Sequence, residues 1–192
     1  MYERIGPIAL VAFGANLPFA GEEPGQTIAK AVKALSAEGL SVLAVSRLYA
    51  TPCFPAGAGP DYVNAAAALQ VEGAFDATSI LQRLHRVEAD FGRIREQRWG
   101  MRTLDVDLLA LGDSVLPDAE TQDAWRLLPR EAQVRTAPDR LILPHPRLQD
   151  RAFVLVPLAD VAPDWVHPRT GQTVRQMLES LPQADRDAVK PL

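Results

Sequence analysis

Two acidic residues, Asp105 and Asp107, stand two positions apart within the run Leu104 to Leu111. The apolar residues of this run predict a strand, in which alternate side chains point to the same face. Both carboxylates should therefore share one face. About 6 Å apart, at an effective dielectric constant near 20, they would repel each other by roughly 3 kcal/mol, which a shared divalent cation would more than offset. Alternatively, nearby arginines pair with both carboxylates.

An arginine cluster precedes this pair, in a segment that begins at Gly92. Its members are Arg93, Arg95, Arg98 and Arg102. Guanidinium groups bind phosphate oxygens and spread the charge of a transferring phosphoryl group, while carboxylates hold the magnesium ions. The cluster therefore predicts a site for a polyphosphate and magnesium. The alternative is that these arginines are solvated in a loop or pair with Glu88, Asp90 and Glu96.

Other polar residues could contact a nucleotide or a flat ring. The sequence contains neither a Walker loop nor a Gly-x-Gly-x-x-Gly turn, so a nucleotide would be bound by side chains. Residues 14–17 form a strand-to-helix turn whose backbone N–H groups could meet an anion, although such a turn is more often only a turn. Tyr62 and Asn64 share one strand face and could hold a flat heterocycle, although both are also common as ordinary surface or core residues. His145 could contact a phosphate or be a simple surface histidine.

The elements that must position these residues follow a strand, helix, strand, strand, helix, strand order. Hydrophobic patterns and turn residues predict strands at 8–13, 40–49, 62–71 and 104–111 and helices at 24–39 and 76–91. The alanines in 62–71 also suit a helix, but the short length favours a strand. The order predicts an α+β fold with a ferredoxin-like antiparallel sheet, both helices on one face and the other face open to ligands.

The remaining segments predict one domain over residues 1–192 with a C-terminal helical extension. A polar, aperiodic excursion at about 113–140 precedes helical stretches at 151–158 and 174–181. A net charge of -4 argues against nucleic-acid or anionic-membrane partners, and no apolar run approaches the roughly 20 residues of a membrane span. With a single cysteine and no secretory signal layout, we expect a cytoplasmic protein, and we expect it to be a monomer.

Several blocks together resemble one enzyme family. In chain order they are residues 14–17, Thr51-Pro52 with 61–64, 92–95, 98–107, 143–147 and 151–155. They resemble the 6-hydroxymethyl-7,8-dihydropterin pyrophosphokinases of folate biosynthesis, from about Ile8 to Pro168. The most specific block is Arg-Trp-Gly-x-Arg-Thr-Leu-Asp-x-Asp at 98–107.

The resemblance implies a ferredoxin-like enzyme that transfers pyrophosphate from ATP to the pterin's hydroxymethyl oxygen and releases AMP, with two magnesium ions. Asp105 and Asp107 would hold the ions and, with Arg93 and Arg102, would be the catalytic residues. The pterin would stack between Tyr62 and Phe153. Its binding residues would be Thr51, Pro52, Phe54, Tyr62, Asn64 and Phe153. The nucleotide-binding residues would be Glu88, Arg93, Arg95, Arg98, Trp99, Arg102, His145 and Arg151.

Some residues depart from the pattern of the family. Ala15 and Pro18 replace the usual residues of the first loop, Met101 stands where proline is frequent, and Glu96 lies in a loop that is often more basic. These departures concern the dynamics of the loops and affinity more than chemistry. Without the resemblance, a magnesium-dependent nucleotidyl transferase and a non-catalytic ferredoxin-like binding module also remain open.

Overall fold

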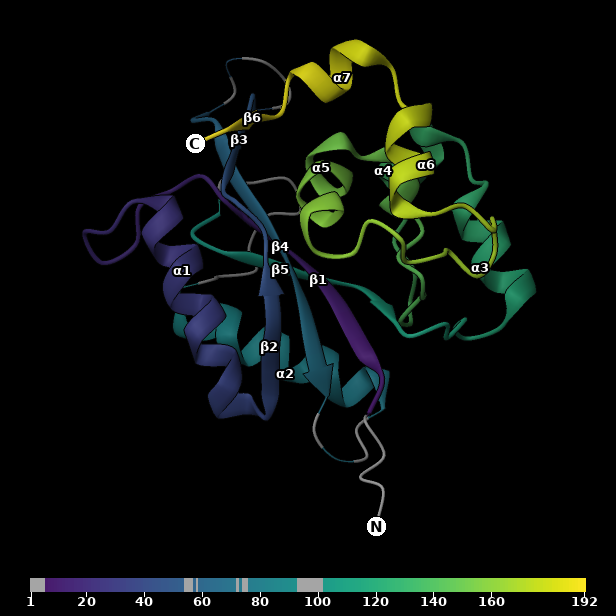
Figure 1. Cartoon of the computed structure of the whole chain (residues 1–192), viewed down its shortest axis with the longest axis horizontal. Helices are drawn as coiled ribbons and strands as arrows, with labels where there is room; N and C mark the ends of the chain where they lie inside the picture. The colour runs from purple at the N-terminus through teal and green to yellow at the C-terminus, as the bar shows by residue number, and fades with distance from the viewer. Residues whose placement is uncertain (1–5, 54–56, 58, 72, 74–75, 93–101) are drawn as a thin grey trace.

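The centre of the protein is an antiparallel sheet, seen in a computed structural model that describes residues 6–53, 57, 59–71, 73, 76–92 and 102–192. Its strands are β1 (Ile8–Ala15), β2 (Leu40–Val45), β3 (Tyr49–Thr51), β4 (Tyr62–Val71), β5 (Asp105–Leu111) and β6 (Lys190–Pro191). β1 pairs with β5 on one side and with β4 on the other, and the far side of β4 pairs with both β2 and β3. The short β6 extends the sheet beyond β3, so the C-terminus lies beside that strand (Figure 1).

Helices cover both faces of this sheet (Figure 1). They are α1 (Pro24–Ala34), η1 (Leu35–Glu38), α2 (Ala77–Asp90), α3 (Ala119–Arg126), α4 (Arg130–Arg135), η2 (Leu148–Asp150), α5 (Ala152–Val161), α6 (Val174–Ser180) and α7 (Gln183–Asp187). One core forms between the sheet and α1 with α2, and a second forms between the sheet and α5 with α6. The prediction that the helices at 24–39 and 76–91 share one face is therefore confirmed. The other face, which was expected to be open, is partly covered by α5 and α6.

The alanine run of β4 lies between these two layers. Ala65 and Ala67 belong to the core under α1 and α2, whereas Ala66 and Ala68 belong to the core under α5 and α6. The strand predicted at 62–71 is confirmed with the same bounds. Burial of both faces here outweighs the helical propensity of alanine, which is only a weak preference.

Two other expectations need correction. The predicted strand 40–49 is divided into β2 and β3, because Ser46 interrupts the pairing: its Oγ accepts a hydrogen bond from Ala66 N at 2.9 Å and donates one to Arg47 O at 2.7 Å. The polar excursion at 113–140 contains the helices α3 and α4, of which α3 begins after Asp118, whose side chain accepts a hydrogen bond from Thr121 N. Within the described ranges, no helix is both long and apolar enough to cross a membrane.

Candidate functional site

The candidate site lies at the end of the sheet where β1 ends and β4 and β5 begin. Gly14 is the register partner of both Asn64 on β4 and Asp105 on β5. Val106 and Leu108 belong to the core under α1 and α2, so strand alternation turns the aspartates on either side of Val106 toward the face that carries α5. The predicted shared face of the two carboxylates is thereby confirmed.

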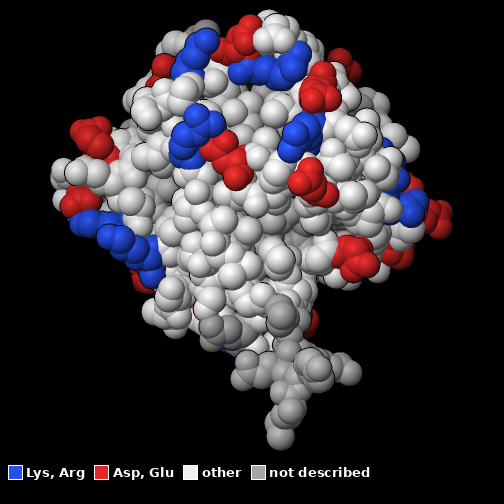
Figure 2. Space-filling model, in the orientation of Figure 1, with Lys and Arg blue, Asp and Glu red and all other residues white. Residues whose placement is uncertain are grey.

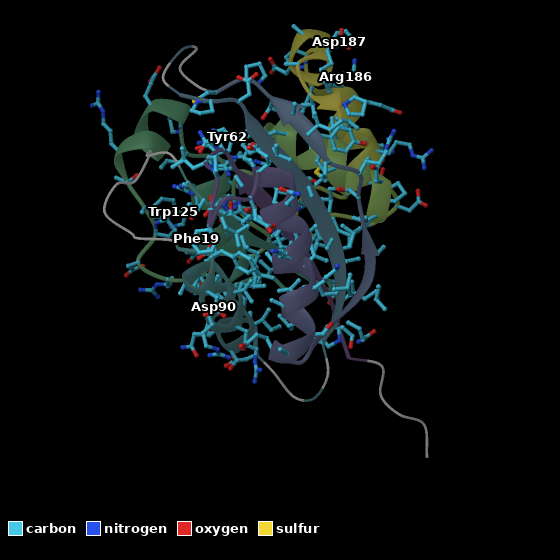
Figure 3. All side chains as sticks on the ribbon, turned by 90° about the vertical axis from the view of Figure 1, so that its left-hand side faces the viewer. Phe19, Tyr62, Asp90, Trp125, Arg186 and Asp187 are labelled. Carbon is cyan, nitrogen blue, oxygen red and sulfur yellow. The ribbon has the colours of Figure 1, made fainter. Side chains whose placement is uncertain are left out.

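Gly14 leaves room for the side chains of β4 beside it. A Cβ atom at this position would lie 3.4 Å from Asn64 Oδ1 and 3.9 Å from Tyr62 Cδ1. Tyr62 stands at the start of β4 (Figure 3). Burial raises the pKa of its hydroxyl, and the charges of Arg102 and Asp105 are close enough to act on it. The strand ends therefore bring the predicted ring-binding tyrosine next to the predicted phosphate site.

Each carboxylate of the pair faces one arginine. Arg102 Nη1 forms an ion pair with Asp105 Oδ2, and Arg151 Nη1 lies 3.9 Å from Asp107 Oδ2. Burial lowers the pKa of Arg151, while Asp107 and Asp105 act in the opposite direction. Arginine pairing, which the sequence left open, is thus present, and the divalent-cation site stays a prediction. Among the described residues there is no group of three or more histidine, cysteine, aspartate or glutamate side chains that could hold a metal ion.

Glu88 of α2 hydrogen-bonds to the start of β5 from the face of the sheet that α1 and α2 cover. Its side chain is buried, with 1% exposure, and its Oε1 accepts a hydrogen bond from Val106 N at 2.7 Å. Val106 is the residue between the two aspartates, so this bond fixes the strand that presents them. Glu88 thus positions β5 from the second helix, and its assignment as a nucleotide-binding residue stays a prediction.

Arg102 is held in place by the turn at the end of β1. Its backbone N–H donates to Asn16 Oδ1 at 2.8 Å, and its carbonyl accepts hydrogen bonds from Asn16 N at 3.0 Å and Leu17 N at 3.1 Å. These two N–H groups therefore bond within the protein and are not available to an anion, in agreement with the interpretation of residues 14–17 as an ordinary turn. Asn16 was not among the predicted site residues, although a polar residue at the end of a buried strand was a usable signal.

The residues expected to bind the pterin come from β3, β4 and α5. Asn64 Nδ2 donates a hydrogen bond to Thr51 Oγ1 at 2.8 Å, and both side chains are largely buried. Pro52 is exposed beside them. Phe153 is 42% exposed, and the Arg151 guanidinium carbon lies 5.7 Å from the centre of its ring. Stacking of a pterin between Tyr62 and Phe153 stays a prediction.

His145 is held in one tautomer beside this cluster. Its Nδ1 accepts a hydrogen bond from Arg147 N at 3.1 Å, and its own backbone N–H donates to Leu109 O at 2.8 Å. Burial lowers the pKa of His145 to about 3, assisted by the charges of Arg151 and Arg147. The ring is therefore neutral near pH 7, with its proton on Nε2, where it can donate to an acceptor such as a phosphate oxygen.

Five of the predicted site residues lie outside the described residues: Phe54, Arg93, Arg95, Arg98 and Trp99. Their roles stay predictions. On the face drawn in Figure 2, the basic side chains of the described residues alternate with acidic ones and do not form a broad basic patch.

Comparison with known proteins gives one consistent family. The model of the 7,8-dihydro-6-hydroxymethylpterin-pyrophosphokinase (HPPK) family matches residues 10–163. A Synechocystis sp. 2-amino-4-hydroxy-6-hydroxymethyldihydropteridine pyrophosphokinase is 43% identical over 133 residues, which cover 69% of this chain and 55% of the relative. A protein of the same name from Methylorubrum extorquens is 35% identical over 174 residues, which cover 90% of this chain and 92% of the relative.

Solved structures show the same fold. The crystal structure of wild-type Plasmodium falciparum HPPK-DHPS matches with a TM-score of 0.62 at 15% identity, over 93% of this chain and 45% of that chain. The chain thus spans about half the length of the Synechocystis relative and less than half of this solved chain, but nearly all of the Methylorubrum relative. With the family model matching most of the chain and 35% identity over nine tenths of it, this protein belongs to the 7,8-dihydro-6-hydroxymethylpterin-pyrophosphokinase family.

Proposed function

We propose that the protein transfers pyrophosphate from ATP to the hydroxymethyl oxygen of 6-hydroxymethyl-7,8-dihydropterin, giving the pterin diphosphate and AMP for folate biosynthesis. The observation that carries this proposal is the meeting of two kinds of side chain at one end of the sheet. Asp105 and Asp107 face the guanidinium groups of Arg102 and Arg151, and the charge of Arg102 is close enough to act on the pKa of the Tyr62 hydroxyl. The side chains proposed to bind phosphate and the ring proposed to contact the pterin thus lie side by side.

Catalysis of this reaction depends mainly on positioning the two substrates and on stabilising the negative charge of the phosphates. The pterin hydroxyl oxygen attacks the β-phosphorus of ATP in line and releases its proton to solvent, while the bond from that phosphorus to the bridging oxygen of the α-phosphate breaks and AMP leaves. Arg102 and Arg151 would neutralise charge on the phosphate oxygens. A single arginine that contacts the transferring group can contribute roughly 10³ to 10⁵ in rate. The neutral His145 would donate a hydrogen bond from its Nε2–H group to a phosphate oxygen.

The two carboxylates fit a pair of magnesium ions. Mg²⁺ is usually bound by one or two carboxylates, substrate phosphates and waters, so a site with two aspartates and no larger protein cage among the described residues suits it. Asp105 and Asp107 would hold the ions, whose positive charge would lower the repulsion between the triphosphate and an attacking oxygen. Glu88 would keep the two carboxylates on one face by fixing Val106.

The pterin would bind between the sheet and α5. Asn64 and Thr51 would read its edge through their hydrogen-bonding groups, and Tyr62 and Phe153 would contact its faces. The exposure of Phe153, 42%, supports this assignment, because an aromatic ring left partly open to solvent at a site is available to stack on a ligand. Pro52 and Phe54 would line the same edge.

We further infer that the chain is one domain built on a ferredoxin-like sheet, with α5, α6 and α7 as its C-terminal extension. The support is the order β5-β1-β4 followed by β2 and β3, when those two are counted as one interrupted strand. A monomer that acts on two small molecules remains our prediction for the assembly.

Product analysis tests the proposed function directly. The protein is incubated with ATP, Mg²⁺ and hydroxymethyl-dihydropterin, with a parallel reaction that lacks the pterin. Pterin-dependent formation of AMP and of the pterin diphosphate is the expected result. Release of free pyrophosphate would instead support a nucleotidyl transferase, and binding of pterin without turnover would support a binding module; either result contradicts the proposal.

A further inference from the structure

We propose that Asp160, at the far end of α5 from the phosphate site, is a positioning residue that holds α5 against β3 and thereby sets the width of the pterin site. This inference rests on the proposed function, because it concerns the same pterin. Asp160 lies in the last turn of α5 and has no place in the blocks that carry the family resemblance.

The Asp160 carboxylate accepts four hydrogen bonds from the junction between β2 and β3. Arg47 donates its backbone N–H and its Nε to Oδ2 at 3.2 and 3.1 Å, and its Nη2 to Oδ1 at 3.0 Å. The Tyr49 hydroxyl donates to Oδ2 at 2.8 Å. Partial burial alone would raise the pKa of Asp160, but the hydrogen bonds from Arg47 and Tyr49 bring it below its ordinary value, so the group is ionised near pH 7.

The break between β2 and β3 makes this contact possible. Ser46 makes both hydrogen bonds to the backbone of Ala66, one through its N–H and one through its Oγ. The backbone N–H of Arg47 is therefore not used in the sheet and donates to Asp160. The Arg47 guanidinium also lies over the Tyr49 ring, 5.4 Å from its centre. A strand that ran unbroken from 40 to 51 would use this N–H in its ladder or turn it outward.

Tyr49 links Asp160 to two parts of the proposed pterin site, the start of α5 and the strand β4. Its ring is buried, with 3% exposure, and packs against Ala152, the residue between Arg151 and Phe153. In the sheet, Tyr49 is the register partner of Asn64, whose amide binds Thr51. A shift of Tyr49 would therefore move the ring of Phe153 relative to the amide of Asn64.

The two ends of α5 are fixed at opposite sides of the sheet. At its start, Arg151 faces Asp107 on β5; at its end, Asp160 binds the β2–β3 junction. The first contact lies at the phosphate site, and the second acts on the pterin site through Tyr49. Loss of the second contact should therefore weaken pterin binding while ATP binding is retained.

The test measures the two substrates separately. Asp160→Asn and Tyr49→Phe are compared with the wild type for the equilibrium Kd of hydroxymethyl-dihydropterin by fluorescence, for the KM of each substrate, and for Tm. We expect the pterin Kd and KM to rise about tenfold in Asp160→Asn, in line with the loss of charge-assisted hydrogen bonds, and to rise in the same direction in Tyr49→Phe. The KM of ATP should stay within about twofold of the wild-type value.

Two further variants exclude a general loss of stability. Glu38→Gln removes a comparable carboxylate, which accepts hydrogen bonds from Arg86 of α2 at 3.0 and 2.6 Å. This variant should change neither the KM of ATP nor that of the pterin. Asp160→Glu keeps the charge and should restore most of the pterin affinity. If Asp160→Asn does not fold, Tyr49→Phe, which keeps the buried ring, gives the same comparison.

The possible failures are distinguishable. Wild-type protein without pterin-dependent AMP formation overturns the proposed function. An active wild type whose pterin Kd is unchanged in Asp160→Asn and Tyr49→Phe overturns this inference alone, and so does an equal rise of both KM values.

Discussion

Asp105 and Asp107 are expected to be needed for turnover and not for folding. Asp105→Asn and Asp107→Asn each keep the shape of the side chain but remove a carboxylate that would hold a magnesium ion. Because such an ion contributes several kcal/mol to the transition state, kcat for AMP formation should fall at least roughly 10²-fold. Tm should change little, since each substitution also relieves repulsion between the two carboxylates.

Asp113→Asn serves as the control for these variants, because Asp113 is exposed and follows the same strand. It should retain wild-type kcat. An Asp105 or Asp107 variant that forms AMP as fast as Asp113→Asn would remove the metal assignment and leave only the arginine pairing that the structure shows.

At this scale, local patterns predicted which residues share a face, but not what holds them there. The period of a strand was enough to turn Asp105 and Asp107 to one side. The partners that fix them are distant in the chain: Glu88 binds Val106 across 18 positions and Asn16 binds Arg102 across 86. No spacing in the sequence encodes such contacts, because they depend on how α2 and β1 pack against β5.

The end of α2 depends on a glycine in contact with another element. Gly92 has φ +78° and follows the helix, and a Cβ atom there would lie 2.4 Å from Phe19 Cε2. Phe19 in turn packs against Phe91, with ring centres 6.0 Å apart. Figure 3 shows Phe19 and, at the end of α2, Asp90. This glycine therefore meets both a backbone requirement and a packing requirement.

Gly92→Ala should destabilise the protein more than Gly21→Ala does. Gly21 has φ +81° with no atom within 4 Å of an added Cβ, so its substitution costs only the left-handed conformation, roughly 1–2 kcal/mol. Gly92→Ala adds the overlap with Phe19, roughly 1–3 kcal/mol more in the free energy of unfolding by urea. In a Phe19→Ala background the two substitutions should cost the same; a difference that persists there would show that Phe19 is not the cause.

The helix α2 was predicted well, whereas the break between β2 and β3 and the helices α3 and α4 were missed. Asp76 accepts a hydrogen bond from Ser79 N at the start of α2, and its sequence position marked that helix correctly. The break between β2 and β3 was missed because Ser46 acts through a hydrogen bond to a neighbouring strand. The helices α3 and α4 were missed because they lie in a polar stretch without a clear apolar stripe.

The largest error concerned the arrangement of the whole molecule. The helical stretch at 151–158 was identified, but not that it covers the second face of the sheet. A usable signal was its composition: α5 buries residues on several sides, including Ala152, Leu155 and Pro157, and a helix that is apolar all round is a buried one. Its placement leaves open the end of this face where β5 begins, which is where the candidate site lies.

The segment between α5 and α6 contains a buried histidine that hydrogen-bonds to the backbone of the turn before α6. His167 is fully buried, and its Nδ1 accepts hydrogen bonds from Arg169 N at 3.1 Å and Thr170 N at 3.4 Å. Its ring packs against Trp165, with centres 5.7 Å apart. These bonds shape the turn that leads to α6, and they require the ring to be neutral at Nδ1.

His167 should make the stability of the whole protein sensitive to acid. Burial, with the charge of Arg126, lowers its pKa to about 4 from 6.5. The unfolded state binds a proton on His167 at a higher pH than the folded state does. The contribution of neutral His167 to the free energy of unfolding is therefore fully present above pH 6.5 and is lost as the pH falls toward 4, with a loss of about 2 kcal/mol at pH 5. His167→Asn keeps an acceptor for Arg169 N but cannot titrate, so its free energy of unfolding by urea should fall less between pH 7.5 and pH 5 than that of the wild type. Carboxylates contribute equally to both proteins, so parallel pH profiles would show that His167 is not the titrating group.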